Sequence, residues 1–159
     1  ENGLDLSIDV GNTNGPWQQQ VCEILKEQLA PIGINLSLNV MPSSKYWEIW
    51  TSTPFGLTAW THRPLGTMVL SLGYRSGVPW NESNYANPEL DRLLAKAEGI
   101  PDPEARREVM AEIERIMQED GPIVQPLWRA VFAAANNRVK GFRLHPVMWI
   151  FGEELAVAS

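Results

Sequence analysis

Few side chains in this sequence could carry covalent chemistry. One cysteine, Cys22, and two histidines, His62 and His145, are the only obvious nucleophiles or general bases. Cys22 stands among apolar residues of a helical pattern, where a thiol acts as a small hydrophobic group, and no neighbour would lower its pKa. Two histidines without a patterned cysteine or carboxylate partner do not form a zinc site. The sequence therefore predicts no catalytic residue, no metal site and no cofactor.

Residues 60–63 point instead to contact with a ligand, because a tryptophan, a histidine and an arginine stand close together there. An indole for stacking, next to a guanidinium that can hold a carboxylate in a bidentate fork, would suit the edge of a small-molecule site. The alternative interpretation places Trp60 in the core and treats Arg63 and His62 as ordinary solvated surface residues.

The loop 11–15, Gly-Asn-Thr-Asn-Gly, is a second candidate, since it follows an expected strand and precedes an expected helix. Backbone N–H groups in such a loop could hold an anion. However, the loop lacks the Lys-Ser/Thr pair of a phosphate-binding loop and the three-glycine spacing of a dinucleotide fold. A plain turn is therefore the favoured interpretation.

The elements that would position these residues follow from hydrophobic periodicity. Apolar and polar residues alternate over 4–10 and over 34–40, which predicts two strands. Between them, a helix is expected to begin near Pro16, with Gln18 and Gln19 on its outer face. A strand, a helix and a strand with short connections form a right-handed unit with parallel strands. The predicted fold class is α/β, a mostly parallel sheet flanked by helices.

The unit then repeats, with a second helix capped by Ser43 or Ser44 and a buried third strand over 55–60. In open α/β sheets the ligand crevice lies beyond the carboxyl ends of the strands, here the segments 11–15, 41–44 and 60–65. An aromatic loop, 75–86, follows a short helix expected over 65–74. The predicted ligand contacts from these segments are Asn12, Ser44, Trp60, His62, Arg63 and Trp80.

The second half of the chain carries strong helix boundaries. Asn87 and Asp102 each precede a proline and an apolar helical pattern, and these patterns end at Gly99 and Gly121. Beyond them, β-branched and apolar residues predict strands over 123–128, 131–135 and 139–144, with a turn at 136–137. The tail 146–151 is apolar throughout, so we expect another surface to cover it.

Composition and charge set the broad class. The 159 residues are 44% hydrophobic, which is enough for one folded domain without disulfides. A net charge of -6 argues against nucleic-acid partners and anionic membrane surfaces. No apolar run approaches the roughly 20 residues of a membrane span, and no secretory leader opens the sequence at Glu1. We therefore expect a soluble, leaderless chain.

The order of elements and three segments resemble the C-terminal lobe of family 5 extracellular solute-binding proteins, the dipeptide-, oligopeptide- and nickel-binding components of ABC importers. Residues 84–94 (NYANPELDRLL), then 105–107 (ARR) and 113–124 (IERIMQEDGPIV), look like the family stretch N-P-x-x-D-x-L-L … R … I-x-x-I-x-x-E-D-x-P-x-I. The segment 28–34 looks like its Q-L-x-x-x-G-I junction between helix and strand. The resemblance runs from about Leu4 to Leu144.

The resemblance implies capture of a peptide-like or other small polar or anionic nutrient in a cleft between two lobes. Hinge closure and delivery to an ABC permease in the inner membrane would follow, in the periplasm, with no bond made or broken. It also implies a ligand-binding α/β lobe at 1–120, and return strands and a tail at 121–159 that would pack on the N-terminal lobe of the same parent chain.

One position departs from the family pattern. Dipeptide binders carry Trp-x-x-Asp at the end of the third strand, where the aspartate pairs with the ligand's amino terminus, whereas here Arg63 occupies the acidic position after Trp60. Because an arginine repels an ammonium group and attracts a carboxylate or phosphate, we expect a ligand with an anionic or neutral polar end rather than a free peptide N-terminus.

Two other functions stay open from the residues alone. One is a small hydrolase or transferase that uses Cys22 or His62. The other is a free-standing interaction domain that holds a protein partner with the tryptophans between Trp47 and Trp80.

Overall fold

The N-terminal third of the chain folds around a small parallel sheet in the computed structural model, which describes residues 3–158. Its strands are β1 (Leu4–Val10), β2 (Ile34–Val40) and β3 (Gly56–Leu57), in the order β2-β1-β3. The central strand β1 pairs in parallel with β2 along its whole length and with β3 through Asp9 and Val10. The predicted α/β arrangement is confirmed. The third strand is shorter than the predicted 55–60, because Val10 is the last residue of β1 that a third strand could pair with.

One face of this sheet is covered by helix α1 (Trp17–Leu29), which continues into the 3-10 turn η1 (Ala30–Ile32). The core between them consists of Ile8, Val10, Cys22 and Leu36, all of which are buried. On the other face, polar side chains of the two long strands pair across the sheet. Asn35 donates to Asp5 at 2.8 Å and Asn39 donates to Asp9 at 2.7 Å. The apolar residues of the alternating pattern therefore face the core, and the polar residues face the other side of the sheet, as the sequence predicted.

Three helices form a second packed unit: α3 (Gly66–Gly73), α4 (Pro88–Glu98) and α5 (Pro103–Asp120). The predicted boundaries are confirmed. The Asn87 side chain accepts hydrogen bonds from two first-turn amides of α4, and Asp102 accepts one from Ala105 in α5. Gly121 ends α5 with a φ of 59°, in the left-handed region that glycine tolerates best. The buried residues of this core are Tyr74, Leu90, Leu93, Leu94, Ala97, Val109, Ile113 and Ile116.

Residues 121–158 form an extended arm. Its regular elements are β4 (Val139–Lys140), the 3-10 turn η2 (Gly152–Glu154) and β5 (Ala156–Val157), which pairs antiparallel with β4. The predicted turn is confirmed, since Val139 N donates to Asn136 O at 2.8 Å. The strands predicted over 123–128 and 131–135 are wrong, and the third is reduced to β4. Strands need a pairing partner, and no strand of the described residues lies beside 123–135.

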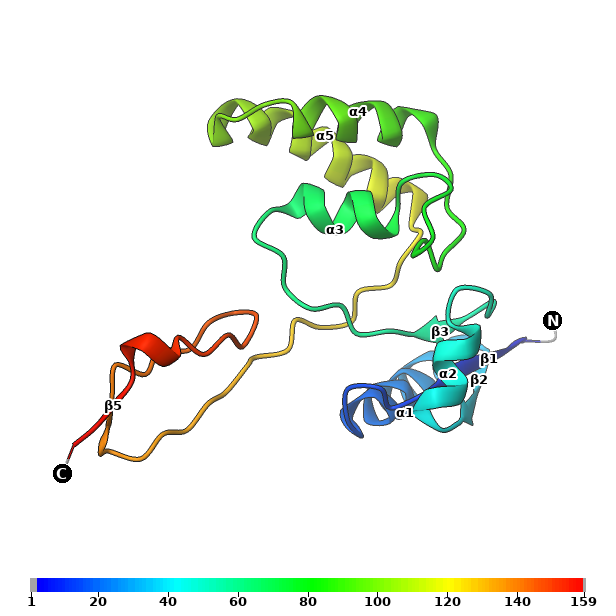
Figure 1. Cartoon of the computed structure of the whole chain (residues 1–159). Coiled ribbons are helices and arrows are strands. Elements are labelled where there is room, and N and C mark those ends of the chain that lie inside the picture. Colours follow the sequence, from blue (N-terminus) through cyan, green and yellow to red (C-terminus); the bar gives the residue numbers. More distant parts are fainter. Residues whose placement is uncertain (1–2, 159) are drawn as a thin grey trace.

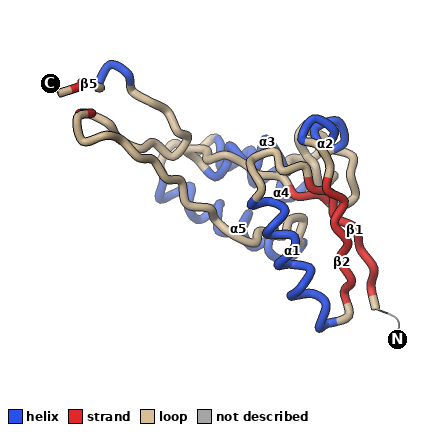
Figure 2. Tube along the Cα trace, turned by 90° about the horizontal axis from the view of Figure 1, so that it is seen from below, coloured by secondary structure: helices blue, strands red, loops and turns tan. Residues whose placement is uncertain are grey.

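Two extended segments leave the helical unit on the side of the sheet: one connects it to β3, and the other leads from α5 into the arm (Figure 1). Near the start of the arm, the Arg129 guanidinium lies 5.2 Å from the centroid of the Trp17 ring in α1. The end of the arm that carries β5 projects away from both packed units (Figures 1 and 2). Its apolar side chains are largely exposed, with Trp128 at 89% and Phe132 at 85%. The apolar tail 146–151 is also exposed, with Trp149 at 67%, and its cover by another surface stays a prediction.

Candidate functional site

The loop 11–15 at the carboxyl end of β1 is held by hydrogen bonds between the loop and the first turns of α1. Gln18, which the sequence pattern placed on the outer face of α1, is fully buried, and that prediction was wrong. Its Oε1 accepts from Asn14 N at 2.7 Å, and its Nε2 donates to Leu57 O at 3.5 Å. Asn12, at a φ of 46°, accepts from Gln19 N at 3.1 Å through its side-chain oxygen. Within the loop, the backbone N–H of Asn14 is therefore occupied, and that of Gly15 donates to Asn12 O at 3.1 Å, which favours the plain turn over an anion site.

Helix α2 (Ser43–Ile49) follows β2 and places Tyr46 over the ends of the sheet. Tyr46 is fully buried and packs against Gly11 and Gly56, where a Cβ would collide with the base of its side chain and with its hydroxyl, respectively. Its hydroxyl lies 2.8 Å from Thr58 Oγ1, and burial raises the pKa of Tyr46 to about 12. Neither predicted serine caps this helix through its side chain, and Ser44 is exposed.

From Tyr46 a series of aromatic rings crosses to the helical unit; we call it the aromatic ladder. Its members, in spatial order, are Tyr46, Trp47, Trp50, Trp80 and Trp60. Successive ring centroids are 5.9, 5.5, 6.2 and 6.0 Å apart, each pair edge to face. Such contacts stabilise aromatic pairs beyond simple burial. The ladder brings together two predicted site residues, Trp60 and Trp80, from different loops.

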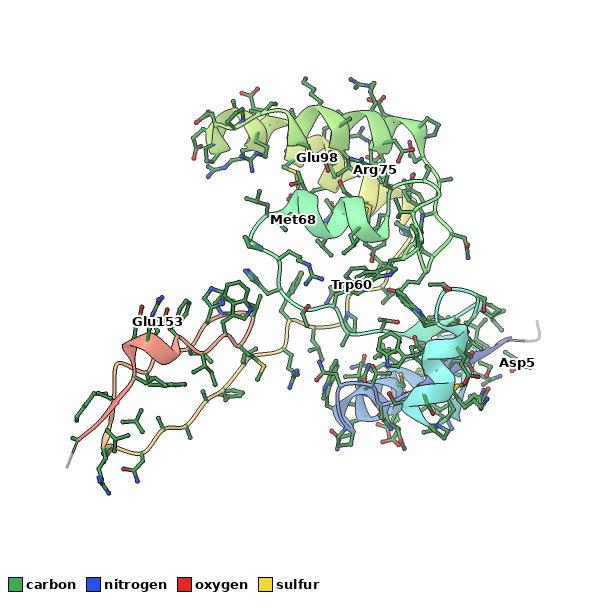
Figure 3. All side chains as sticks on the ribbon, in the orientation of Figure 1. Asp5, Trp60, Met68, Arg75, Glu98 and Glu153 are labelled. Atoms are coloured by element: carbon green, nitrogen blue, oxygen red, sulfur yellow. The ribbon has the colours of Figure 1, made fainter. Side chains whose placement is uncertain are left out.

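Trp60 lies between the sheet unit and the helical unit (Figure 3). A Cβ added at Gly73 would lie 3.0 Å from two atoms of its indole, so the glycine makes room for the ring. The indole Nε1 donates a hydrogen bond to Glu82 Oε1 at 2.7 Å. Trp60 is thus only partly buried and is held on two sides, so it is neither an ordinary core residue nor a freely moving surface residue.

The loop that carries Trp80 and Glu82 is built around Asn81, which is only 7% exposed. Its Nδ2 donates to the carbonyls of Arg75 and Tyr85 at 3.1 and 2.7 Å. Its Oδ1 accepts from Tyr85 N at 3.2 Å and from Ser83 Oγ at 3.0 Å. One side chain therefore fixes both ends of a turn and the position of Glu82 within it.

The other predicted contacts lie apart from the tryptophan pair. His62 is exposed, and Arg63 is partly buried with its guanidinium folded back on its own loop. Arg63 NH1 donates to Thr61 Oγ1 at 2.7 Å and to the carbonyls of Thr61 and His62. The structure brings Trp60 and Trp80 into contact. Among residues 3–158, no side-chain hydrogen bond or ring contact joins either tryptophan to Asn12, Ser44, His62 or Arg63.

Sequence reasoning missed Glu82. This carboxylate stands beside Trp60, although the two residues are 22 positions apart in the chain. No spacing rule connects a loop glutamate to a tryptophan at that separation. Only the fold of the 74–87 loop reveals the pair.

The side chains considered for catalysis are placed unfavourably for it. Cys22 is fully buried, and burial raises the pKa of its thiol to about 11, opposite to what a nucleophile requires. His145 stacks on Trp149 with ring centroids 5.7 Å apart, within the arm. Within residues 3–158, no three His, Cys, Asp or Glu side chains gather in a way that could hold a metal ion.

Hollows of the surface lie elsewhere. One is lined by Glu104, Arg107 and Glu108 on the outer face of α5, and another lies along the edge of β1, β2 and α1 near Asp5. Neither includes any of the six predicted contacts. Over the part of the chain described, none of the helices has the length and apolarity of a membrane span.

Comparison with curated proteins finds relatives with one common role. The chain is 23% identical over 147 residues to the dipeptide-binding protein DppE of Bacillus subtilis (strain 168), covering 91% of this chain and 27% of that protein. It is 31% identical over 74 residues to the probable D,D-dipeptide-binding periplasmic protein DdpA of Escherichia coli (strain K12), covering 46% of this chain and 14% of that protein. No protein-family model matches the chain.

Solved structures give the same fold. A putative peptide binding protein, AppA from Clostridium difficile, superposes with a TM-score of 0.82 at 20% identity. The match covers 99% of this chain and 34% of that one. The chain therefore spans about a quarter to a third of the length of the proteins it resembles along most of its own sequence.

Proposed function

We propose that this chain, whose homologues and structural neighbours are family 5 solute-binding proteins of ABC importers, forms one side of a cleft that captures a small solute. The observation that carries the proposal is the aromatic pair Trp60 and Trp80 beyond the end of β3, at the edge of a parallel sheet. Ligands of open α/β folds bind at such edges.

The proposed site is half a cleft. The predicted contacts line none of the surface hollows described above, and both His62 and Ser44 are exposed. We propose that residues 1–120 form the ligand-binding lobe, and that the N-terminal lobe of the same parent chain supplies the opposite wall. Closure of the two lobes would then exclude water from the solute.

The arm, residues 121–158, supports this division. It exposes Trp128, Phe132, Trp149 and Ile150, which a stable domain would normally cover. We propose that the arm and the final residue pack on the N-terminal lobe as the return connection. Exposed aromatic residues also fit the alternative, a protein-interaction domain, in which a different protein would cover the arm.

The chemistry of the ligand is proposed from the polar groups near Trp60. The donors of Arg63 that its own loop does not use would pair with an anionic or neutral polar end of a peptide-like or other small nutrient. The solute would be released unaltered to an ABC permease in the inner membrane from a periplasmic protein. No enzymatic step is proposed, because the one thiol is buried and has a raised pKa.

Binding by the intact natural protein that contains this sequence tests the proposal. Native mass spectrometry of the purified protein should show a bound small molecule that is recovered chemically unchanged. A thermal-shift panel of amino acids, dipeptides, dicarboxylates and nickel–histidine should contain at least one ligand that stabilises the protein. At a hundred times its Kd, such a ligand raises the free energy of unfolding by about 2.7 kcal/mol. Trp60→Ala should lower the affinity for that ligand, whereas Trp128→Ala should leave the affinity unchanged.

The same measurements separate the alternatives. Turnover of a panel compound that disappears in Cys22→Ala would favour the enzyme. A stable complex with a second protein through the arm, without any bound solute, would favour the interaction domain.

A further inference from the structure

Strand β2 has a free edge. It lies at one end of the sheet order β2-β1-β3, and among residues 3–158 no strand other than β1 pairs with it. Natural proteins normally protect such an edge by keeping it very short, or by placing a charge, a proline or a bulge on it. The opposite edge, β3, is only two residues long, whereas β2 has seven residues, INLSLNV, without a charge or a proline. The edge of β2 can therefore accept another strand.

The backbone groups that this edge presents follow from the pairing with β1. At one end of β2, Gly33 O accepts from Leu4 N at 2.8 Å, and at the other end Met41 N donates to Val10 O at 3.0 Å. These two odd-numbered residues thus direct their groups towards β1. Because the direction alternates along a strand and the register is continuous, the outward N–H and C=O groups belong to the even-numbered residues of β2: Ile34, Leu36, Leu38 and Val40.

The sequence of β2 is nearly symmetric about its central residue, Ser37. Residues at equal distances from it have the same polarity and similar shape: Leu36 and Leu38, Asn35 and Asn39, Ile34 and Val40. When a second β2 runs antiparallel with its Ser37 opposite this one, each residue meets its match on the same face of the sheet. The outward backbone groups of the even-numbered residues then face each other as hydrogen-bonded pairs.

The apolar side of the edge also fits a second copy. Val40 is 46% exposed, and in this register it would lie opposite Ile34 of the second copy. Ile34 lines a hollow beside the edge, together with Leu36 of the same strand and Lys26 and Ala30 of α1. The exposed valine of one copy can therefore be covered at the hollow of the other.

On the polar side of the sheet, uncharged amides would meet. Asn35 and Asn39 each donate one N–H to an aspartate of β1, at 2.8 and 2.7 Å. Each amide keeps its carbonyl oxygen and a second N–H, so the two can bond to each other across the copies. The register therefore places no like charges directly opposite each other on β2.

From these observations we infer that two copies of the protein pair through their β2 edges, about a two-fold axis at Ser37, and join their two sheets into one. The same surface of each copy is used, so the association closes at two. This inference goes beyond solute binding and does not depend on it.

Sedimentation of the intact natural protein over a concentration series should show a dimer. Ser37→Lys places two like charges opposite each other at the axis and should raise the dissociation constant of the dimer at least about tenfold. Ser52→Lys is the matched control and should dimerise as the wild type does. Ser52 is exposed like Ser37, and the two hydroxyls donate to backbone carbonyls at 3.0 and 3.1 Å.

Cysteine cross-linking tests the register. Directly opposite residues in a non-hydrogen-bonded pair have Cα atoms about 4.5 Å apart, within the range of a disulfide. Ser37→Cys should therefore form a disulfide-linked dimer on oxidation. Asn35→Cys should not, because its counterpart lies about 13 Å further along the second strand. The Cys22 thiol within this chain is buried.

Four outcomes would overturn the inference. One is a wild-type protein that stays monomeric up to about 100 μM. Another is a Ser37→Lys dimer as stable as the Ser52→Lys dimer. Cross-linking of Asn35→Cys without cross-linking of Ser37→Cys would contradict the register. A monomer that shields the Ser37→Cys thiol from a maleimide would mean that another part of the parent chain covers β2.

Discussion

Replacing Asn81 with alanine should destabilise the loop that carries Trp80 and Glu82. The substitution removes the partners of three backbone groups: the carbonyls of Arg75 and Tyr85 and the N–H of Tyr85. Each net hydrogen bond is worth about 0.5–1.5 kcal/mol, and Asn81 is buried, so that water replaces it poorly. We expect a loss of about 2–4 kcal/mol in the free energy of unfolding.

Urea unfolding followed by circular dichroism measures this loss, and hydrogen exchange at the Tyr85 amide tests its location. Ser83→Ala is the matched control, because it removes one exposed donor to the same Asn81 side chain and should cost less than about 1 kcal/mol. If Asn81→Ala costs no more than the serine variant and the Tyr85 amide stays protected, then Asn81 does not organise the loop. In that case Asn81 would not be what holds Glu82 in place beside Trp60.

Three further predictions address packing and pH. Gly73→Ala should cost about 1–2 kcal/mol, because its Cβ would press on Trp60 at 3.0 Å; an unchanged urea midpoint would contradict this contact. Leu94→Ala, in the fully buried centre of the helical unit, should cost about 3 kcal/mol in the same assay, and a cost below about 1 kcal/mol would mean that this core is not packed as described. Burial raises the pKa of Tyr46 and of Tyr74 to about 12, so the folded state favours their neutral forms. That contribution to stability is complete below the unfolded pKa near 10 and disappears as pH rises towards 12. Tyrosinate absorbance should therefore appear together with loss of circular dichroism, and two tyrosines titrating near pH 10 in a folded protein would refute the burial.

Local signals predicted the elements well. The alternation over 4–10 and 34–40 became β1 and β2, and the caps at Asn87 and Asp102 became the observed starts of α4 and α5. These features depend on residues within a few positions of each other. The capping hydrogen bonds and the alternation of faces along a strand are therefore local properties, although the hydrogen bonds of β1 and β2 join the two strands to each other.

The failures are of a different kind. Residues 123–135 have the composition of strands but remain unpaired, because a strand is defined by a neighbour and none lies beside them in the part of the chain that the structure describes. Gln18 was placed on the outside of α1 because it is polar. Its buried position depends on the main-chain groups of Asn14 and Leu57, which a helical wheel does not contain.

The candidate site was also predictable from the sequence only in part. From the sequence, the carboxyl ends of the strands could be located, and Trp60, Arg63 and Trp80 could be named as residues near them. The tertiary structure alone decided that Trp60 meets Trp80, that Arg63 folds back on its loop, and that Glu82 stands beside the indole. Periodicity and capping are short-range properties of the chain, whereas a recognition site joins loops whose separation along the chain carries no information about their distance in space.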